Sequence, residues 1–167
     1  WTYGIVAAVA CVLLIAGFLW LKPSTPEELF VEYFSMPSSP ATLGPNDELY
    51  PRAFSLYQEG NYQEALNVFE QLDMDSLATS QQEELAYFES LIHLQLGDTD
   101  VAIQSLQLIT QKSDSPYAPN ARYYLGMAFL SNGQADNALA LFKEVQQNSD
   151  VSKTMREDAA KLVAELE

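Results

Sequence analysis

The feature that most constrains this chain is an internal repeat. Gly60, Gly97 and Gly133 stand 37 and then 36 residues apart, and the same residue types flank each of them. A small residue lies seven positions before each glycine, and an alanine lies five positions after it. A large apolar residue follows at nine positions and a further apolar residue at twelve. Each unit of such a repeat buries its apolar face by stacking on its neighbours. In chain order these residues are Ala53, Ser90 and Gly126; Ala65, Ala102 and Ala138; Phe69, Leu106 and Phe142; and Leu72, Ile109 and Val145.

The stretch from Arg122 to Val145 predicts two helices joined by a tight turn at Asn132-Gly133. Glycine allows the left-handed conformation that ends a helix cleanly. The small residues Gly126 and Ala138 let two helices approach closely, so that Phe142 can fill the space between neighbouring pairs. We expect helix pairs near 46–59 and 62–73, near 81–96 and 99–110, and near 116–131 and 135–147, with Asn61, Ser80, Asp98 and Ser115 as caps.

The repeat resembles the tetratricopeptide repeat (TPR), a helix–turn–helix unit of about 34 residues. The resemblance covers roughly residues 47–150 and is carried best by LYQEGNYQEALNVF at 56–69 and YLGMAFLSNG at 124–133. Two departures concern the loops between repeats: the period is two or three residues longer, and Thr99 stands where tyrosine is usual. The alternative is an ordinary helical bundle whose periodicity is a coincidence.

An uncharged run of 19 residues, from Tyr3 to Leu21, precedes the repeats. As a helix it is about 28 Å long, close to the thickness of a bilayer's hydrocarbon core. Tyr3 and Trp20 stand at its ends, where aromatic rings favour the membrane interface. A cleaved signal peptide has a shorter apolar run and a small-residue cleavage site, and a core helix carries a polar stripe. We therefore predict a transmembrane anchor over residues 1–22.

The orientation of this anchor rests on few residues. Because the sequence begins at Trp1, we expect the residues that set the orientation to precede it, and Lys22 by itself favours a cytoplasmic C-terminal side. The domain that follows is strongly acidic and has few basic residues near the membrane, so little opposes its translocation. We expect a single-pass protein of a bacterial inner membrane with its repeats in the periplasm.

Residues 23–45 are predicted to be a juxtamembrane linker with a short helix. Its sequence Thr25-Pro26-Glu27-Glu28 is typical of a helix start. The aromatic residues Phe30, Tyr33 and Phe34 follow, and the segment is either a spacer or docks onto the first repeat or a membrane partner. The stretch ELFVEYFSMPSSPATLG also resembles the juxtamembrane part of single-pass repeat proteins from Bacteroidota.

The remaining chain, residues 46–167, is predicted to be one TPR domain. Its last helix, about 152–166, has one apolar and one charged face, as the end of a repeat stack requires. The expected fold is all-α: one N-terminal transmembrane helix, an α-solenoid of about three helix pairs and a C-terminal capping helix. The repeats are expected at about 46–79, 80–114 and 115–150, with the cap at 151–167.

Composition and residue types argue against several functions. The net charge is −15, with 23 acidic and 8 basic residues, which excludes electrostatic attraction to nucleic acid. Cys11 is the single cysteine, and the single histidine, His93, falls in a packing position, so neither a nucleophile–base pair nor a transition-metal site is readily assembled. The acidic pairs at turns lack the glycine-centred loop of a calcium site. We expect no enzyme, no cofactor and no metal.

The TPR resemblance implies a concave groove, lined by the first helix of each pair, that binds a peptide. Family members that clamp a terminal carboxylate use lysine, arginine and asparagine, and only Asn120 is of that type here. The implied groove is otherwise aromatic and apolar, which suits tyrosine. Alternatively, these residues pack against one another or under the Phe30–Phe34 segment. The implied rows are Tyr50, Tyr87 and Tyr123; Phe54, Leu91 and Met127; and Tyr57, Leu94 and Leu130.

These features predict a non-enzymatic, membrane-anchored interaction module. It would be a scaffold, or an accessory or assembly subunit of a membrane or envelope complex, with membrane or envelope proteins as partners. The bilayer would be contacted through the one transmembrane helix, and no nucleic acid would be bound. In one alternative the transmembrane helix binds the partner and the repeats are a passive cover. In another the chain is a transmembrane regulatory sensor whose missing N-terminal part signals in the cytoplasm.

Overall fold

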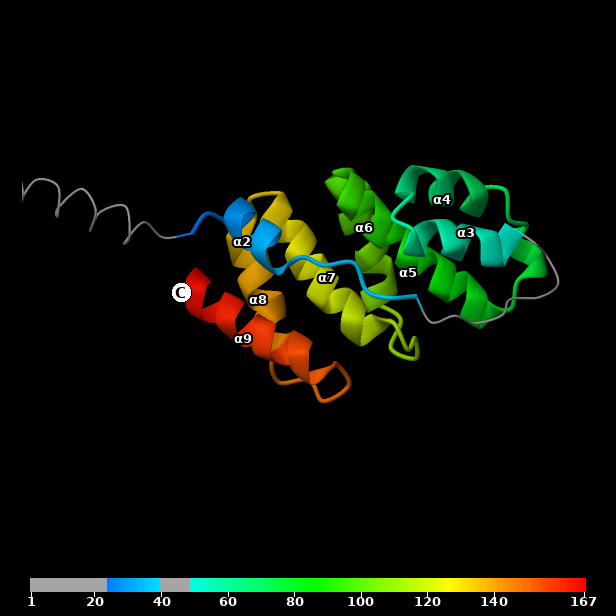
Figure 1. Cartoon of the computed structure of the whole chain (residues 1–167). Helices are drawn as coiled ribbons and strands as arrows, with labels where there is room; N and C mark the ends of the chain where they lie inside the picture. Colours follow the sequence, from blue (N-terminus) through cyan, green and yellow to red (C-terminus); the bar gives the residue numbers. More distant parts are fainter. Residues whose placement is uncertain (1–23, 40–48) are drawn as a thin grey trace, which may run out of the picture.

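The computed structural model of the protein describes residues 24–39 and 49–167, and over these residues the chain is all-α (Figure 1). Three helix pairs, α3–α4, α5–α6 and α7–α8, follow one another, and α9 packs on α8. Because the main contacts join helices that are consecutive in the chain, the architecture is an α-solenoid. The helices are α2 (Pro26–Tyr33), α3 (Leu49–Gln58), α4 (Tyr62–Phe69), α5 (Thr79–Leu96), α6 (Thr99–Thr110), α7 (Ala118–Ser131), α8 (Ala135–Val145) and α9 (Lys153–Leu166), with a short 3-10 helix η1 (Met74–Ser76).

The three repeated glycines form the turns inside the helix pairs. Gly60, Gly97 and Gly133 have φ angles of 80°, 88° and 66°, the left-handed conformation that the sequence predicts. In every turn the amide of the next residue donates to the carbonyl five residues earlier, at 2.9, 2.8 and 2.7 Å. This 6→1 hydrogen bond closes a Schellman motif. The internal repeat is therefore confirmed at its turns.

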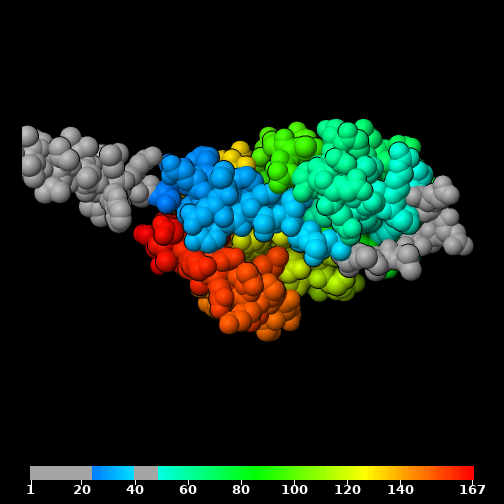
Figure 2. All heavy atoms as spheres, in the orientation of Figure 1, coloured from blue at the N-terminus to red at the C-terminus, as the bar shows by residue number. Residues whose placement is uncertain are grey.

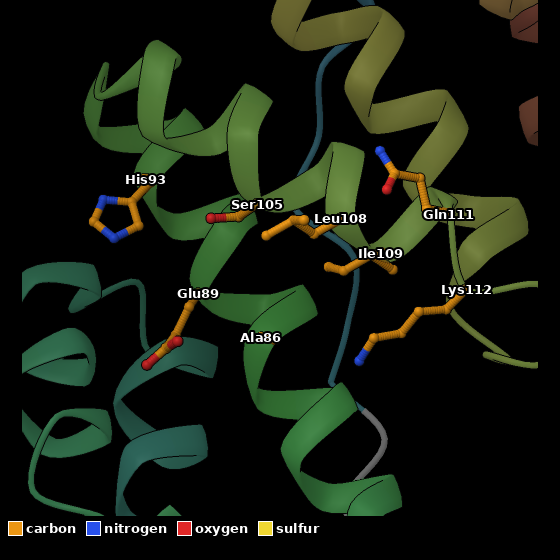
Figure 3. Close-up of a pocket in the computed structure, with 8 residues that line it drawn as sticks. All are labelled: Ala86, Glu89, His93, Ser105, Leu108, Ile109, Gln111 and Lys112. Carbon is orange, nitrogen blue, oxygen red and sulfur yellow. The ribbon is translucent and has the colours of Figure 1, made fainter.

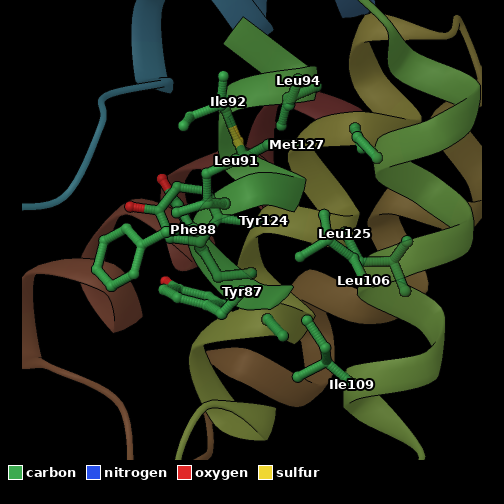
Figure 4. Close-up of a cluster of buried hydrophobic side chains, with 14 of the residues drawn as sticks. Tyr87, Phe88, Leu91, Ile92, Leu94, Leu106, Ile109, Tyr124, Leu125 and Met127 are labelled. Atoms are coloured by element: carbon green, nitrogen blue, oxygen red, sulfur yellow. The ribbon is translucent and has the colours of Figure 1, made fainter. Parts of the chain in front are cut away.

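The four other repeated positions form the core between the helices. Ala65, Ala102 and Ala138 are fully buried, so the two helices of each pair lie close together. The large residues nine positions after each glycine are at most 1% exposed. Figure 4 shows part of this core, where side chains of α5, α6 and α7 meet. The three-pair packing predicted from the sequence is thus present.

Two predicted caps are in place and two are wrong. Asn61 and Asp98 precede α4 and α6, although neither side chain bonds to its helix. Ser80 lies inside α5, which begins one residue earlier. Ser115 lies outside α7, and its hydroxyl accepts the amide of Tyr117 at 3.3 Å instead. Helix boundaries are the least certain part of a pattern-based prediction.

Helix α4 is shorter than predicted. The sequence pattern extends this helix over 62–73, but α4 ends at Phe69. The side chain of Asp73 accepts the amide of Asp75 at 3.2 Å and starts η1, which turns the chain away from the helix. Residues 70–73 therefore form a turn in place of a last helical turn.

Helix α2 begins as predicted. The Glu28 amide donates to the Thr25 hydroxyl at 3.2 Å, and the Thr25 amide donates to the Glu28 carboxylate at 2.8 Å. These two bonds form a capping box. The short helix expected in the juxtamembrane segment is therefore confirmed.

The predicted anchor over residues 1–22, including Tyr3 and Trp20, lies outside the described residues. Within 24–39 and 49–167, none of the helices has the length and apolar character needed to cross a membrane.

Candidate binding groove

The segment 24–39, called the strap below, lies across the helices that form the groove (Figure 1). Its helix α2 packs against α7, and its extended part runs from there towards α3. In the space-filling view the strap lies between α9 and the first repeat (Figure 2). The strap therefore covers predicted groove residues, Tyr57 and Tyr123 among them.

Three tyrosine hydroxyls hold the strap by its backbone. Tyr123 Oη donates to the Tyr33 carbonyl at 3.3 Å, and Tyr124 Oη donates to the Ser35 carbonyl at 3.1 Å. Tyr57 Oη donates to the carbonyl two residues further on, that of Pro37, at 2.6 Å. Ser35 and Pro37 lie in the extended part of the strap, where alternate carbonyls point to the same side, and Tyr33 is the last residue of α2. The tyrosines therefore bind the backbone of the strap, because all three acceptors are main-chain atoms.

Aromatic and apolar contacts hold the other end of the strap. Leu29 of α2 is buried, with 1% of its surface exposed. The rings of Phe30 and Phe34 stack with centroids 4.8 Å apart, and Phe34 meets Tyr124 edge-on at 6.2 Å. Lys161 of α9 lies 5.9 Å from the centroid of the Tyr33 ring, within cation–π range. The aromatic segment thus docks within the chain, and mainly on the third repeat, where the sequence suggested the first.

A buried carboxylate lies at the other end of the groove. Glu84 of α5 is 5% exposed and accepts the Tyr50 hydroxyl at 2.6 Å, and it lies near enough to Tyr117 to influence that phenol. Burial, and then the charge of this carboxylate, raise the pKa of Tyr117 to about 12. Burial followed by the hydrogen bond to Glu84 raises the pKa of Tyr50 far above its usual value. The Tyr50–Glu84 bond joins the first and second repeats through a hydroxyl donor.

The ten predicted groove residues have different environments. Tyr57 and Tyr123 contact the strap, whereas Tyr50 faces Glu84 and Tyr87 stacks on Tyr117 with centroids 5.0 Å apart. Asn120 is half-buried near the start of α7. Whether any of these residues binds a partner chain stays a prediction. Nine of the ten belong to the buried core and are at most 7% exposed, namely Tyr50, Phe54, Tyr57, Tyr87, Leu91, Leu94, Tyr123, Met127 and Leu130.

The sequence prediction missed three residues of this site. Tyr124, Glu84 and Tyr117 fall outside the three rows that the resemblance implied. Tyr124 has a detectable signal, because it stands in register with the aromatic Phe88 of the previous repeat. Glu84 has a signal too, because its register partner in the third repeat is Asn120, one of the predicted groove residues.

The single histidine is at a turn. His93 Nδ1 lies 3.2 Å from Asp98 Oδ2, and the two residues flank Gly97. In the part of the chain that the structure describes, no three histidine, cysteine or acidic residues are grouped so as to hold a metal ion.

The repeated turns and the stacked pairs agree with a comparison against protein families. Residues 87–152 match the tetratricopeptide repeat model. The match runs from Tyr87 of α5 to the residue before α9, so it includes the whole third pair and most of the second. Neither the curated proteins nor the solved structures gave a match to this chain. TPR sequences are protein-interaction repeats, which makes a protein-binding module the class of function that the match supports.

Proposed function

We propose that this protein is a non-enzymatic, membrane-anchored TPR interaction module, acting as a scaffold or as an accessory or assembly subunit of a membrane or envelope complex. The TPR match and the stacked helix pairs support the interaction role. The uncharged run from Tyr3 to Leu21 supports the anchor, and the acidic domain supports a periplasmic location in a bacterial inner membrane. Its partners would be membrane or envelope proteins.

One observation carries the interaction role: the groove already holds an extended segment through its carbonyls. Tyr57, Tyr123 and Tyr124 make three hydrogen bonds to alternate backbone positions, and such bonds do not depend on the side chains of the ligand. The strap is therefore an internal ligand of a peptide-binding groove. We expect a partner segment to enter the groove only when the strap leaves it.

The position of the strap adds a second role. It starts at residue 24, directly after the predicted anchor at 1–22. A docked strap would hold the repeat stack close to the bilayer surface, and a released strap would let the stack swing outward on a tether of about 23 residues, 23–45. Tether length sets the effective concentration of a linked domain, so release would change which partners it can reach.

Releasing the strap should open the groove to peptide. The change Leu29→Asp with Phe34→Ala introduces a charge into the buried α2 contact and removes a ring that packs on Tyr124. We expect a fluorescent peptide with the sequence of residues 24–39 to bind this variant with micromolar affinity, and to bind the wild type at least tenfold more weakly. Fluorescence anisotropy on the full chain in detergent measures both.

A matched control separates groove binding from general stickiness. In the same strap-released background, Tyr57→Phe with Tyr124→Phe removes two hydroxyl donors and leaves the rings. Each lost hydrogen bond should weaken peptide binding by about fivefold, and circular dichroism should show unchanged helicity. Equal binding with and without these hydroxyls would contradict the proposed backbone recognition.

The complex itself is tested by gentle detergent extraction of the full chain followed by mass spectrometry. We expect a stoichiometric set of membrane or envelope proteins with the wild type. A chain whose residues 3–21 are replaced by a generic apolar helix should keep this set, since the repeats carry the recognition. Loss of the set in that variant would move the binding element to the transmembrane helix.

A further inference from the structure

A cavity of about 520 Å³ opens on α5 and α6, on a different side from the groove (Figure 3). Ala86, Glu89 and His93 line it from α5, and Ser105 and Leu108 line it from α6. In Figure 3 the strap runs behind the helices that carry these residues. The cavity is therefore separate from the site described above.

The cavity arises where the second repeat departs from the third. A shift of 36 residues pairs Ala86 with Arg122, and it pairs the polar Glu89 and Ser105 with leucines in the third repeat. The covering helix differs too: α4 ends early and packs on α5 less extensively than α6 packs on α7. Smaller side chains and a shorter covering helix leave the space open.

The cavity has one carboxylate, that of Glu89, among walls of mixed character: Ala86, Leu108 and Ile109 are apolar, and His93, Ser105, Gln111 and Lys112 are polar or basic. Burial is the main reason that the pKa of Glu89 is raised, and nearby Glu70 adds to it while His93 opposes it. Among the described residues, no lysine or arginine forms an ion pair with Glu89. Lys112, which also lines the cavity, lies 3.9 Å from Glu83 instead. A partly desolvated carboxylate of this kind gains most from a cation that brings its own hydrogen-bond donors.

The third repeat shows which side chain suits this place between helix pairs. Arg122, the register partner of Ala86, donates to the Thr110 carbonyl at 3.4 Å and lies 3.9 Å from the Glu144 carboxylate. An arginine thus stands at the corresponding position one repeat later, although its carboxylate partner Glu144 is in register with Leu108 of the second repeat. In the second repeat the position is held by alanine, so an arginine would have to come from outside the chain.

We propose that this cavity binds an arginine side chain, together with a neighbouring apolar residue, from a partner protein. The net charge of −15 favours the approach of a basic partner. Leu108 at the rim is 64% exposed and offers an apolar surface to the residue next to the arginine. At such an interface the partner would cover this exposed leucine, and its arginine would pair with the Glu89 carboxylate.

Nuclear magnetic resonance on the ¹⁵N-labelled full chain in detergent micelles tests this site. The probe is the peptide acetyl-Leu-Arg-Leu-amide. The control is the same peptide with citrulline in place of arginine, which has nearly the same shape without the charge. We expect saturable shifts of the Ser105 and Leu108 amides with the arginine peptide, and at least tenfold weaker binding of the citrulline peptide. Absence of localised shifts up to about 10 mM peptide would overturn the proposal.

Variants separate this site from general attraction to an acidic surface. Glu89→Gln should weaken arginine-peptide binding at least tenfold, whereas Glu165→Gln, the same charge change on exposed α9, should alter it less than twofold. Ala86→Arg should abolish binding, because it places an arginine of the chain itself in the cavity, at the position that Arg122 has one repeat later. An equal loss with Glu89→Gln and Glu165→Gln would overturn the site. Spermidine producing the same localised shifts at equal affinity would overturn the protein partner.

Discussion

Raising the pH above about 10 is expected to unfold the repeat stack, because its buried tyrosines fit only as neutral phenols. Burial is the main reason that the pKa values of Tyr57, Tyr87 and Tyr124 are raised well above their usual range. Tyr117 has a pKa of about 12 for the same first reason, with the Glu84 charge as the second. Ionising any of these rings in place would put a charge into the core.

The sign of this effect follows from proton linkage. Between about pH 10 and the raised native pKa, the unfolded chain has lost phenolic protons that the folded chain still holds, so the free energy of unfolding falls as the pH rises. The contribution of each such tyrosine is complete below about pH 10 and decreases by about 1.4 kcal/mol per pH unit above it. Several such groups titrating together would remove the usual stability of a small domain, about 5–15 kcal/mol, within one or two pH units.

The measurement is the urea midpoint from far-ultraviolet circular dichroism at a series of pH values from 8 to about 12, followed together with tyrosinate absorbance. Loss of helicity and tyrosine ionisation should coincide, and helicity should return at pH 8. Tyr87→Phe is the matched variant, since its hydroxyl makes no hydrogen bond within the described residues, and it should reduce the slope by about 1.4 kcal/mol per pH unit. Ordinary tyrosine titration with helicity intact would contradict this account.

Much of the fold could be predicted from the sequence because the repeat encodes itself locally. Gly60, Gly97 and Gly133 mark turns whose closing residue adopts the left-handed backbone conformation. The alanines and large apolar residues at fixed distances from them mark the faces on which the helices contact one another. The early end of α4 could not be predicted in this way. Leu72 continues the apolar pattern, while the competing hydrogen bond of Asp73 is a local choice that periodicity does not express.

The occupant of the groove was harder to predict for a different reason. Tyr123 donates to the Tyr33 carbonyl, 90 residues away in the chain. Every residue, proline included, has such a carbonyl. Recognition of the backbone therefore leaves no side-chain signature in the ligand segment. The aromatic cluster around Phe30 and Phe34 was the available signal, and it indicated docking but on the first repeat, whereas the segment docks mainly on the third.

Replacing Gly126 by valine is expected to lower the free energy of unfolding by about 3 kcal/mol. Gly126 is buried in α7, and a Cβ atom at this position would lie 2.7 Å from Cε1 and 2.9 Å from Cζ of Phe142. Phe142 is fully buried, so its ring has little room to move, and the branched side chain of valine adds two methyl groups to the same space. The gain in helix propensity over glycine recovers less than about 1 kcal/mol of this loss. Urea unfolding followed by circular dichroism measures the difference.

The second repeat supplies the control for this contact. At the positions of Gly126 and Phe142 it has Ser90 and Leu106, both fully buried, so a larger first residue is matched by a smaller second one. Gly126→Ser alone should cost about 2 kcal/mol and Phe142→Leu alone about 1–2 kcal/mol. The double variant recreates the pair of the second repeat, and it should be more stable than the sum of the single changes by at least about 1 kcal/mol. Simple additivity would mean that the two side chains do not share this space, and the close approach of α7 and α8 would then need another cause.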